Sequence, residues 1–404
     1  MPIKRPALAP QLRLVGEARA RAHGGYCLDG SPPGFWYDPP AVDVGGSDLG
    51  NRSWLLFLDG GSWCYDEHDC ESRAKGFKGS SRGYPPRYWP YSGPMDARPS
   101  VNPTFARFHR VLLGYCDGSS FLSDRTAPLV SSTGGAPLYM RGRRVLEAQV
   151  AELLDLGLRD ATHVLFSGGS AGGLGALHAA NAVQQLLPRA EVFKVLLLSG
   201  FFLMPPSRGL GAGATCTKGR DAARRCVPWA QRMRGMCMLH NCTPTLRESH
   251  SDGCGAHRLA ADSATTPAAA GRWRCMFPAA SLPRVRAPVF IINSALDSWQ
   301  LVNVWRRFYR CRYDSVGGCS AQQTDEAVSA TNTMLDRFVS DLRLSGALSR
   351  AGHGAFVTSC NEHVGGLSPE GFGGFRIGDA RAARTARAVR VAPTSPQALV
   401  LALP

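Results

Sequence analysis

One strand–turn–helix unit constrains the fold of this 404-residue chain more than any other feature of the sequence. The apolar run 163–166 leads into a G-x-S-x-G motif at residues 168–172, and the Ala- and Leu-rich run 174–187 then has helical spacing. The glycines let the backbone turn sharply and present the Ser170 hydroxyl above a sheet edge, at a helix N-terminus that favours negative charge. The bare pattern also occurs in ordinary turns, but the flanking strand and helix favour a serine nucleophile.

A serine nucleophile requires a carboxylate and a histidine, which follow it in that order in sheets of this kind. Asp297 comes after the β-branched run 288–293, which reads as a buried parallel strand, and we predict that it is the acid. His353 and His363 are the two histidines beyond Asp297. His353 lies between two glycines and His363 closes the segment 355–363, and spacing alone does not choose between them.

Five apolar runs predict the strands of a sheet, near residues 54–58, 163–167, 192–198, 288–293 and 355–359. A helix near 143–156 carries an apolar stripe and precedes the nucleophile strand. Together these elements predict an α/β fold, with a mostly parallel sheet flanked by helices, in a single domain over residues 1–379. We expect the Ala- and Arg-rich tail 380–404 to be poorly ordered.

Two irregular stretches separate these elements. Segment 66–104 is rich in Gly, Pro, Tyr and Arg and predicts a long loop at the rim of the site. Four of its aromatic side chains either stack on sugar rings or, as is commoner, pack against the core: Tyr84, Tyr88, Trp89 and Tyr91. The second stretch predicts a cap or loop region stapled by disulfides, because it contains Cys216, Cys226, Cys237, Cys242, Cys254 and Cys275.

The 13 cysteines are many for a cytosolic hydrolase and indicate disulfides formed in an oxidising compartment. The number is odd, so at least one thiol is unpaired or bonded to another chain, and we select Cys360. The sequence has no tandem metal-type cysteine pairs and no H-E-x-x-H motif, so we expect no metal and no cofactor. We expect a secreted protein of the extracellular space or cell wall, although no signal peptide is visible, and no transmembrane segment.

The net charge of the chain indicates which kinds of partner it can attract. The chain has 46 Lys and Arg against 31 Asp and Glu, a formal net charge of +15. Such a surface attracts an acidic polysaccharide, an anionic surface or a nucleic acid. No nucleic-acid motif with interleaved aromatic residues is present, so we expect a polysaccharide partner and no nucleic acid.

Several motifs, in one order and spread over roughly residues 12–365, carry a family resemblance. They are CLDGSPP at 27–33, LDGGSWC at 58–64, YCDGS at 115–119, SGGSAGGL at 167–174, NSALDSWQ at 293–300 and FVTSCNEH at 356–363. On these motifs the chain resembles the pectin acetylesterase family, whose animal branch includes the Notum-type carboxylesterases. The residues DSWQ and CDGS are the forms that these motifs take in the plant branch. The resemblance implies an α/β-hydrolase-like fold with disulfide-rich loop or cap insertions.

The resemblance also implies the base. The catalytic histidine of the family comes just after a Ser-Cys pair at the end of a strand, which selects His363 over His353. The implied triad is therefore Ser170, Asp297 and His363. Two disulfides are implied as well: Cys27–Cys116 and Cys64–Cys70.

An oxyanion hole is expected from backbone N–H groups. In this architecture one donor is the residue after the nucleophile, here Ala171, and the others come from an early glycine-rich loop. By resemblance those are Gly61 and Ser62, and Trp63 lines the wall of the site. The chain departs from the family at Ser62, where a glycine or tryptophan is usual, and at Leu198, where an acidic residue is usual.

The expected function is removal of O-acetyl groups from a pectin-like polysaccharide by a serine carboxylesterase through an acyl-enzyme intermediate. One alternative is a Notum-like lipid, or protein-acyl, carboxylesterase, which requires a deep apolar acyl pocket. The other is a catalytically weak protein that binds acidic polysaccharide, which the departures at Ser62 and Leu198 bring into consideration.

Overall fold

The computed structural model describes most of the sheet and the helices around it. The described residues are 10–40, 52–88, 92–132, 134–204, 229–242, 245–246, 272–305, 321–358, 361–364, 376–377, 380–381 and 399–401. All statements below refer to them.

A nine-stranded sheet organises the described part of the chain, in the order β1-β2-β4-β3-β5-β6-β7-β8-β11. β2 pairs antiparallel with β1 and β4, and every other pair in this sheet is parallel. The prediction of a mostly parallel sheet is thus confirmed. Its strands are β1 (Gln11–Leu14), β2 (Gly34–Asp38), β3 (Ser53–Leu58), β4 (His109–Leu113), β5 (His163–Gly169), β6 (Val192–Leu198), β7 (Val289–Ser294), β8 (Gly354–Thr358) and β11 (Leu399–Leu401).

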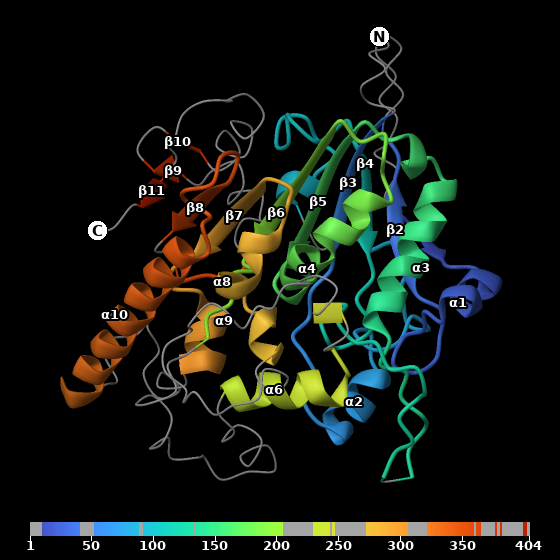
Figure 1. Cartoon of the computed structure of the whole chain (residues 1–404), viewed down its shortest axis with the longest axis horizontal. Coiled ribbons are helices and arrows are strands. Elements are labelled where there is room, and N and C mark those ends of the chain that lie inside the picture. Colours follow the sequence, from blue (N-terminus) through green and yellow to red (C-terminus); the bar gives the residue numbers. More distant parts are fainter. Residues whose placement is uncertain are drawn as a thin grey trace.

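Helices cover the sheet and gather at one end of it. In Figure 1, α3 and α4 cross one face of the sheet, while α2, α6 and α9 lie below the sheet in the view. A separate two-stranded sheet pairs β9 (Arg376–Ile377) with β10 (Ala380–Arg381). The helices are α1 (Glu17–His23), α2 (Glu67–Ala74), α3 (Gly142–Asp155), α4 (Ala171–Gln185), α6 (Trp229–Leu239), α8 (Pro278–Ser281), α9 (Ser298–Gln300) and α10 (Ala321–Leu344).

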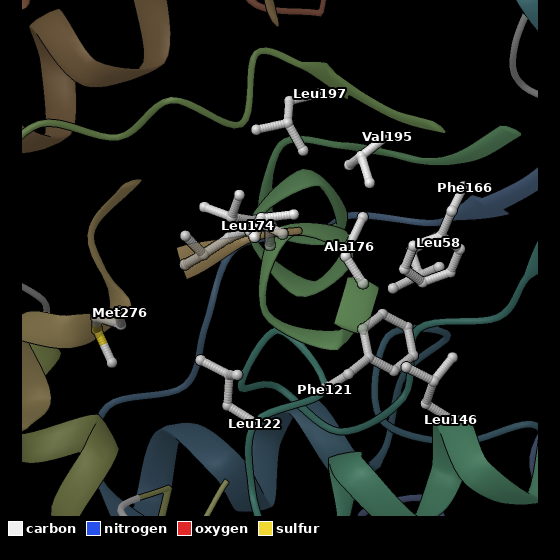
Figure 2. Close-up of a cluster of buried hydrophobic side chains, with 14 of the residues drawn as sticks. Leu58, Phe121, Leu122, Leu146, Phe166, Leu174, Ala176, Val195, Leu197 and Met276 are labelled. Atoms are coloured by element: carbon white, nitrogen blue, oxygen red, sulfur yellow. The ribbon is translucent and has the colours of Figure 1, made fainter. Parts of the chain in front are cut away.

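Helix α4 is the centre of the main apolar core. Figure 2 shows Leu174 and Ala176 of this helix among side chains from the sheet and from the segments that cover it. Burial of each large apolar side chain contributes about 1.5–3 kcal/mol, so α4 is fixed on both sides. The labelled neighbours, all buried, are Leu58, Phe166, Val195 and Leu197 from the strands and Phe121, Leu122, Leu146 and Met276 from the opposite side.

A second apolar cluster lies apart from this core and includes Trp36, Phe57 and Leu198. Tyr84 is 6% exposed and its ring centroid lies 4.7 Å from that of Trp36. Tyr88 packs on the same tryptophan at 5.1 Å. These two tyrosines are therefore packing residues, whereas Trp89 and Tyr91 lie outside the described residues.

The segment expected to be a continuous rim loop contains a helix, which corrects the loop prediction over part of 66–104. Helix α2 occupies Glu67–Ala74 and begins at Asp66, whose side chain accepts a hydrogen bond from the Asp69 backbone N–H. This N-cap satisfies one of the free donors at the helix start. Composition concealed the helix because its residues are almost all polar.

Three disulfides are present among the described residues. Cys27–Cys116 and Cys64–Cys70 confirm the pairing that the family resemblance implies. Cys237–Cys242 joins the end of α6 to the turn after it. Cys275 is also disulfide-bonded, whereas Cys360 lies outside the described residues and its free thiol stays a prediction.

The C-terminal tail contributes β10 and β11. β11 pairs parallel with β8 at the edge of the sheet, while 382–398 and 402–404 lie outside the described residues. Disorder of the tail and the division into one domain and a tail stay predictions. No helix in the described part of the chain is long and apolar enough to cross a membrane.

Candidate active site

Ser170 occupies a sharp turn between β5 and α4. Its backbone has φ 54° and ψ −125° and so leaves the ordinary regions for a residue with a side chain. The turn is tight because glycines let the helix approach the strands. A Cβ atom at Gly172 would stand 2.1 Å from the carbonyl oxygen of Leu58, so only glycine fits there. The local sequence therefore builds a strained turn that projects the Ser170 side chain at the start of the helix.

The structure brings Ser170, His363 and Asp297 into one hydrogen-bonded chain. The Ser170 Oγ lies 2.8 Å from His363 Nε2, and His363 Nδ1 lies 2.7 Å from Asp297 Oδ2. Asp297 is fully buried and its Oδ1 accepts the backbone N–H of Gln300 at 2.9 Å, which caps α9. The carboxylate is thus oriented at both oxygens, and the imidazole is held between an acid and a hydroxyl.

Parallel strands explain why these three residues meet. Ser170 follows β5, Asp297 follows β7 and His363 comes five residues after β8 ends at Thr358. These strands lie in the parallel part of the sheet, so their carboxyl ends share one edge. His353 precedes β8 and therefore lies at the opposite edge. Burial lowers its pKa to about 4.

The loop after β3 borders the turn at Ser170. A Cβ atom at Gly60 would stand 3.4 Å from Ala171 N, so this loop faces the N-terminus of α4. The buried Asp59 side chain holds the start of the loop: Oδ1 accepts the Gly60 N–H at 2.8 Å, and Oδ2 pairs with Lys78. Because Gly60 donates to Asp59, its N–H is not directed at Ser170.

The carbonyl oxygens of the next three residues in this loop accept hydrogen bonds from side chains outside the loop. Arg73 donates to the carbonyl oxygen of Gly61 at 2.8 Å and to that of Trp63 at 3.2 Å. The Tyr115 hydroxyl donates to the carbonyl oxygen of Ser62 at 2.7 Å, where Ser62 has φ 58°. With these oxygens fixed, the orientation of the peptide N–H groups between them is fixed as well.

Aromatic rings pack beside His363. Trp63, 2% exposed, contacts Phe202, Trp229 and Trp299 edge to face, with ring centroids 5.0–5.5 Å apart. Phe202 and Trp299 in turn lie 6.4 and 6.1 Å from the His363 ring. We call these four residues the aromatic cluster. Of the four, the sequence analysis named only Trp63 as a site residue.

Sequence reasoning missed the residues that fix the loop after β3 and most members of the aromatic cluster. Asp59, Tyr115 and Trp299 lie inside the quoted motifs, so the sequence contained a signal for them. Arg73 lies outside these motifs and gave no such signal, because its role depends on contacts with the loop after β3. Leu198, one of the two positions noted above as departures from the family, packs its side chain in the second apolar cluster, and its carbonyl oxygen accepts the Ser170 N–H at 2.9 Å.

A cysteine–histidine group lies behind the loop. His240 Nε2 is 3.4 Å from both Cys64 Sγ and Cys70 Sγ and 3.2 Å from the Cys64 carbonyl oxygen. The spacing resembles a metal site, but the two sulfurs are joined in a disulfide and are not thiolate ligands. Burial lowers the pKa of His240 to about 3, so the ring is neutral.

The fold and the turn at Ser170 define an α/β-hydrolase-like protein. The sequence model of the pectinacetylesterase family matches residues 7–372. The chain therefore belongs to the pectinacetylesterase family and is a carboxylic ester hydrolase by class.

Relatives of two kinds are similar to the chain. Pectin acetylesterase 5 of Arabidopsis thaliana is 31% identical over 329 residues, covering 79% of this chain and 67% of that protein. Pectin acetylesterase 7 of the same plant is 29% identical and covers 92% and 84%. Human palmitoleoyl-protein carboxylesterase NOTUM is 28% identical over 283 residues, covering 68% and 49%.

Solved structures share the fold of this chain. Two crystal forms of the Wnt deacylase Notum from Drosophila superpose with TM-scores of 0.65 and 0.68, at 19% identity. Each superposition covers 95% of this chain and 93% of the other. At this identity the likeness concerns the fold.

Proposed function

We propose that the protein is a secreted serine esterase that removes acetyl groups from an acidic, pectin-like polysaccharide. The observation that carries the chemistry is the chain from Ser170 Oγ to His363 and on to Asp297, at 2.8 and 2.7 Å. A nucleophile in hydrogen-bond contact with a base, itself oriented by a carboxylate, is the arrangement that acyl transfer requires.

In this mechanism His363 Nε2 takes the proton of the Ser170 hydroxyl while Oγ attacks the ester carbonyl carbon. Asp297 keeps Nδ1 protonated and stabilises the imidazolium. The tetrahedral intermediate collapses as His363 returns the proton to the leaving alcohol of the sugar, which leaves an acetyl-serine. Water then gives a proton to His363 and attacks the acetyl group, and as the bond to Ser170 Oγ breaks, His363 returns that proton to Oγ and acetate is released.

The negative oxygen of the intermediate is assigned to the N–H groups of Gly61, Ser62 and Ala171. No described group accepts a hydrogen bond from these three donors, and Ala171 lies at the positive end of α4. Contacts from Asp59 and Arg73 orient the loop in advance, so no reorganisation is needed during the reaction. Loss of one donor in such a site costs about 3–4 kcal/mol.

The acyl group is assigned as acetyl because of the aromatic cluster. Phe202 lies 6.4 Å from the His363 ring, is 1% exposed and packs against Trp63, which in turn packs against the equally buried Trp229. A two-carbon acyl group needs little room, whereas a long chain would have to displace rings that are already close-packed. This packing favours the acetylesterase over the lipid esterase.

The polymer is assigned from charge and from the family. A net charge of +15 attracts a polyanion such as a galacturonan, and the plant relatives are named pectin acetylesterases. Three disulfides among the described residues support a secreted protein that works outside the cell.

The test is acetate release from acetylated pectin by the oxidised protein, beside Ser170→Ala. Release by the parent and not by the variant is the expected result. Equal release by both rejects the serine mechanism. Hydrolysis of long-chain esters without release from pectin selects the lipid esterase, and binding of polygalacturonate without turnover of any ester selects the binding protein.

A further inference from the structure

The end of β6 contacts both segments that carry the proposed chemistry. The Ser170 N–H donates to the carbonyl oxygen of Leu198 at 2.9 Å. The next residue, Ser199, accepts the backbone N–H of Val364 on its Oγ, also at 2.9 Å. Val364 directly follows His363. Two consecutive residues therefore hold the nucleophile turn and the histidine segment in one place.

Both ends of the second contact are strained. Ser199 has φ 48° and Val364 has φ 54°. For a β-branched residue such as valine the left-handed conformation is a true outlier, and strain of this kind persists only where surrounding contacts determine the conformation. The Ser199 hydroxyl is one such contact, since it fixes the Val364 N–H.

Ser199 is itself rigidly placed. Its own N–H donates to the carbonyl oxygen of Ile292 on β7 at 2.8 Å, and the residue is 4% exposed. The following Gly200 lies against Gly173 of α4, where a Cβ atom would stand 3.0 Å from the Gly173 Cα. The hydroxyl is therefore a fixed point of the sheet from which the segment after β8 is held.

We propose that Ser199 is a positioning residue for His363. Its hydroxyl holds Val364 in the left-handed conformation, and this turns the preceding residue so that Nε2 faces Ser170 and Nδ1 faces Asp297. Without that acceptor Val364 relaxes toward negative φ and the imidazole rotates away from one or both partners. Ser199 acts only through Val364, and the role rests on the proposed function of His363.

The experiment compares Ser199→Ala with the parent on a small neutral ester, p-nitrophenyl acetate. Displacement of a catalytic group by about 1 Å costs on the order of a hundred-fold in rate, so we expect kcat to fall about ten- to a hundred-fold with KM nearly unchanged. Ser345→Ala is the matched control. Ser345 is buried and its hydroxyl also accepts a backbone N–H, that of Ala347, beyond the end of α10.

A second change separates positioning from simple loss of a buried hydrogen bond. Glycine adopts positive φ without a steric penalty, so Val364→Gly placed on top of Ser199→Ala should recover a large part of kcat. No recovery overturns the proposal, as does a kcat for Ser199→Ala within about three-fold of the parent. If Ser199→Ala does not fold, Ser199→Gly, which lacks the hydroxyl but tolerates the backbone, replaces it in the same comparison.

The role is also measured without turnover. The far-downfield proton resonance of the His363–Asp297 hydrogen bond, assigned with His363→Ala, should broaden or vanish in Ser199→Ala and remain in Ser345→Ala. A resonance unchanged in Ser199→Ala contradicts the positioning role even in a protein with no esterase activity. Absence of ester turnover by the parent contradicts the proposed function instead.

Discussion

Gly60 lies against Ser170 so closely that a side chain does not fit between them. A Cβ atom at Gly60 would stand 2.4 Å from the carbonyl oxygen of Gly169 and 3.1 Å from Ser170 Cβ. The first of these contacts is with backbone, which cannot rotate away. The loop after β3 and the turn at Ser170 are therefore in direct atomic contact.

Substitution of Gly60 tests this fit. In Gly60→Ala the added methyl group must push the loop or the nucleophile turn aside, and overpacking of this kind costs about 1–3 kcal/mol of stability. We expect kcat to fall by about a hundred-fold, because both sides of the proposed oxyanion hole shift. Gly83→Ala is the control, since a Cβ atom there meets nothing within 4 Å. Equal activity of the two variants would contradict the close fit.

The Asp297 carboxylate caps α9 and, in the proposed mechanism, orients His363, and one substitution separates these two roles. In Asp297→Asn the amide oxygen still caps α9 at the Gln300 N–H, but the negative charge facing His363 Nδ1 is lost. We expect kcat to fall on the order of 10⁴-fold, with the melting temperature nearly unchanged. Asp297→Ala, which removes the cap as well, should lose the same activity and also about 1 kcal/mol of stability. Steady-state kinetics and thermal unfolding of both variants measure the two effects.

Acyl-chain preference should respond to Phe202. Phe202→Ala empties ring volume beside His363, so we expect the ratio of butyrate to acetate ester hydrolysis to rise at least about ten-fold, at a stability cost of about 3–5 kcal/mol. The neighbouring Phe201 is fully buried and packs on Phe338 instead. Phe201→Ala should cost similar stability without the change in preference. An equal shift in both variants would mean that the aromatic cluster does not limit the acyl group.

Stability should fall in acid because buried histidines are neutral. Burial lowers the pKa of His240 to about 3 and that of His178 to about 4, against about 6.5 in the unfolded chain. As pH falls, these histidines take up a proton in the unfolded chain at a higher pH than they do in the folded protein, and this favours unfolding. Their stabilisation is thus present above pH 6.5 and is lost as pH falls toward the folded values. Between pH 7 and pH 5 each of the two histidines should lower the free energy of unfolding by about 2 kcal/mol.

Urea unfolding at pH 7 and pH 5 measures this loss. In His240→Gln the amide retains a donor for the Cys64 carbonyl oxygen but does not titrate, so the decrease in unfolding free energy should shrink by about 2 kcal/mol. His178→Gln should give a similar reduction. A decrease that is the same in the parent and both variants assigns the acid sensitivity to other groups.

Sequence patterns located the parts of the fold that local composition determines. The apolar runs predicted β3, β5, β6, β7 and β8 to within two residues, because these strands are buried and strongly apolar. β1 is mostly exposed, with the burial pattern of a polar segment. Such a strand is defined by its pairing partner rather than by its own residues.

The residues of the candidate site also fall into those that local sequence predicts and those that only the whole fold defines. Ser170 and Asp297 carry local signals, a glycine turn and a buried strand. Between His353 and His363 the decision depends on which edge of the sheet each one reaches, and that is a property of the whole sheet. The contacts of Arg73 with the loop and of Ser199 with Val364 join residues that no local pattern connects.

The Cys64–Cys70 bond has a practical consequence for anyone preparing this enzyme. Both sulfurs are buried, and the bond closes the chain one residue beyond Trp63. In the reducing cytosol of a bacterial host such a bond does not persist, and the loop beside Ser170 then lacks its covalent tie. Two preparations of equal purity can therefore differ in active fraction, so titration of free thiols belongs beside every reported specific activity.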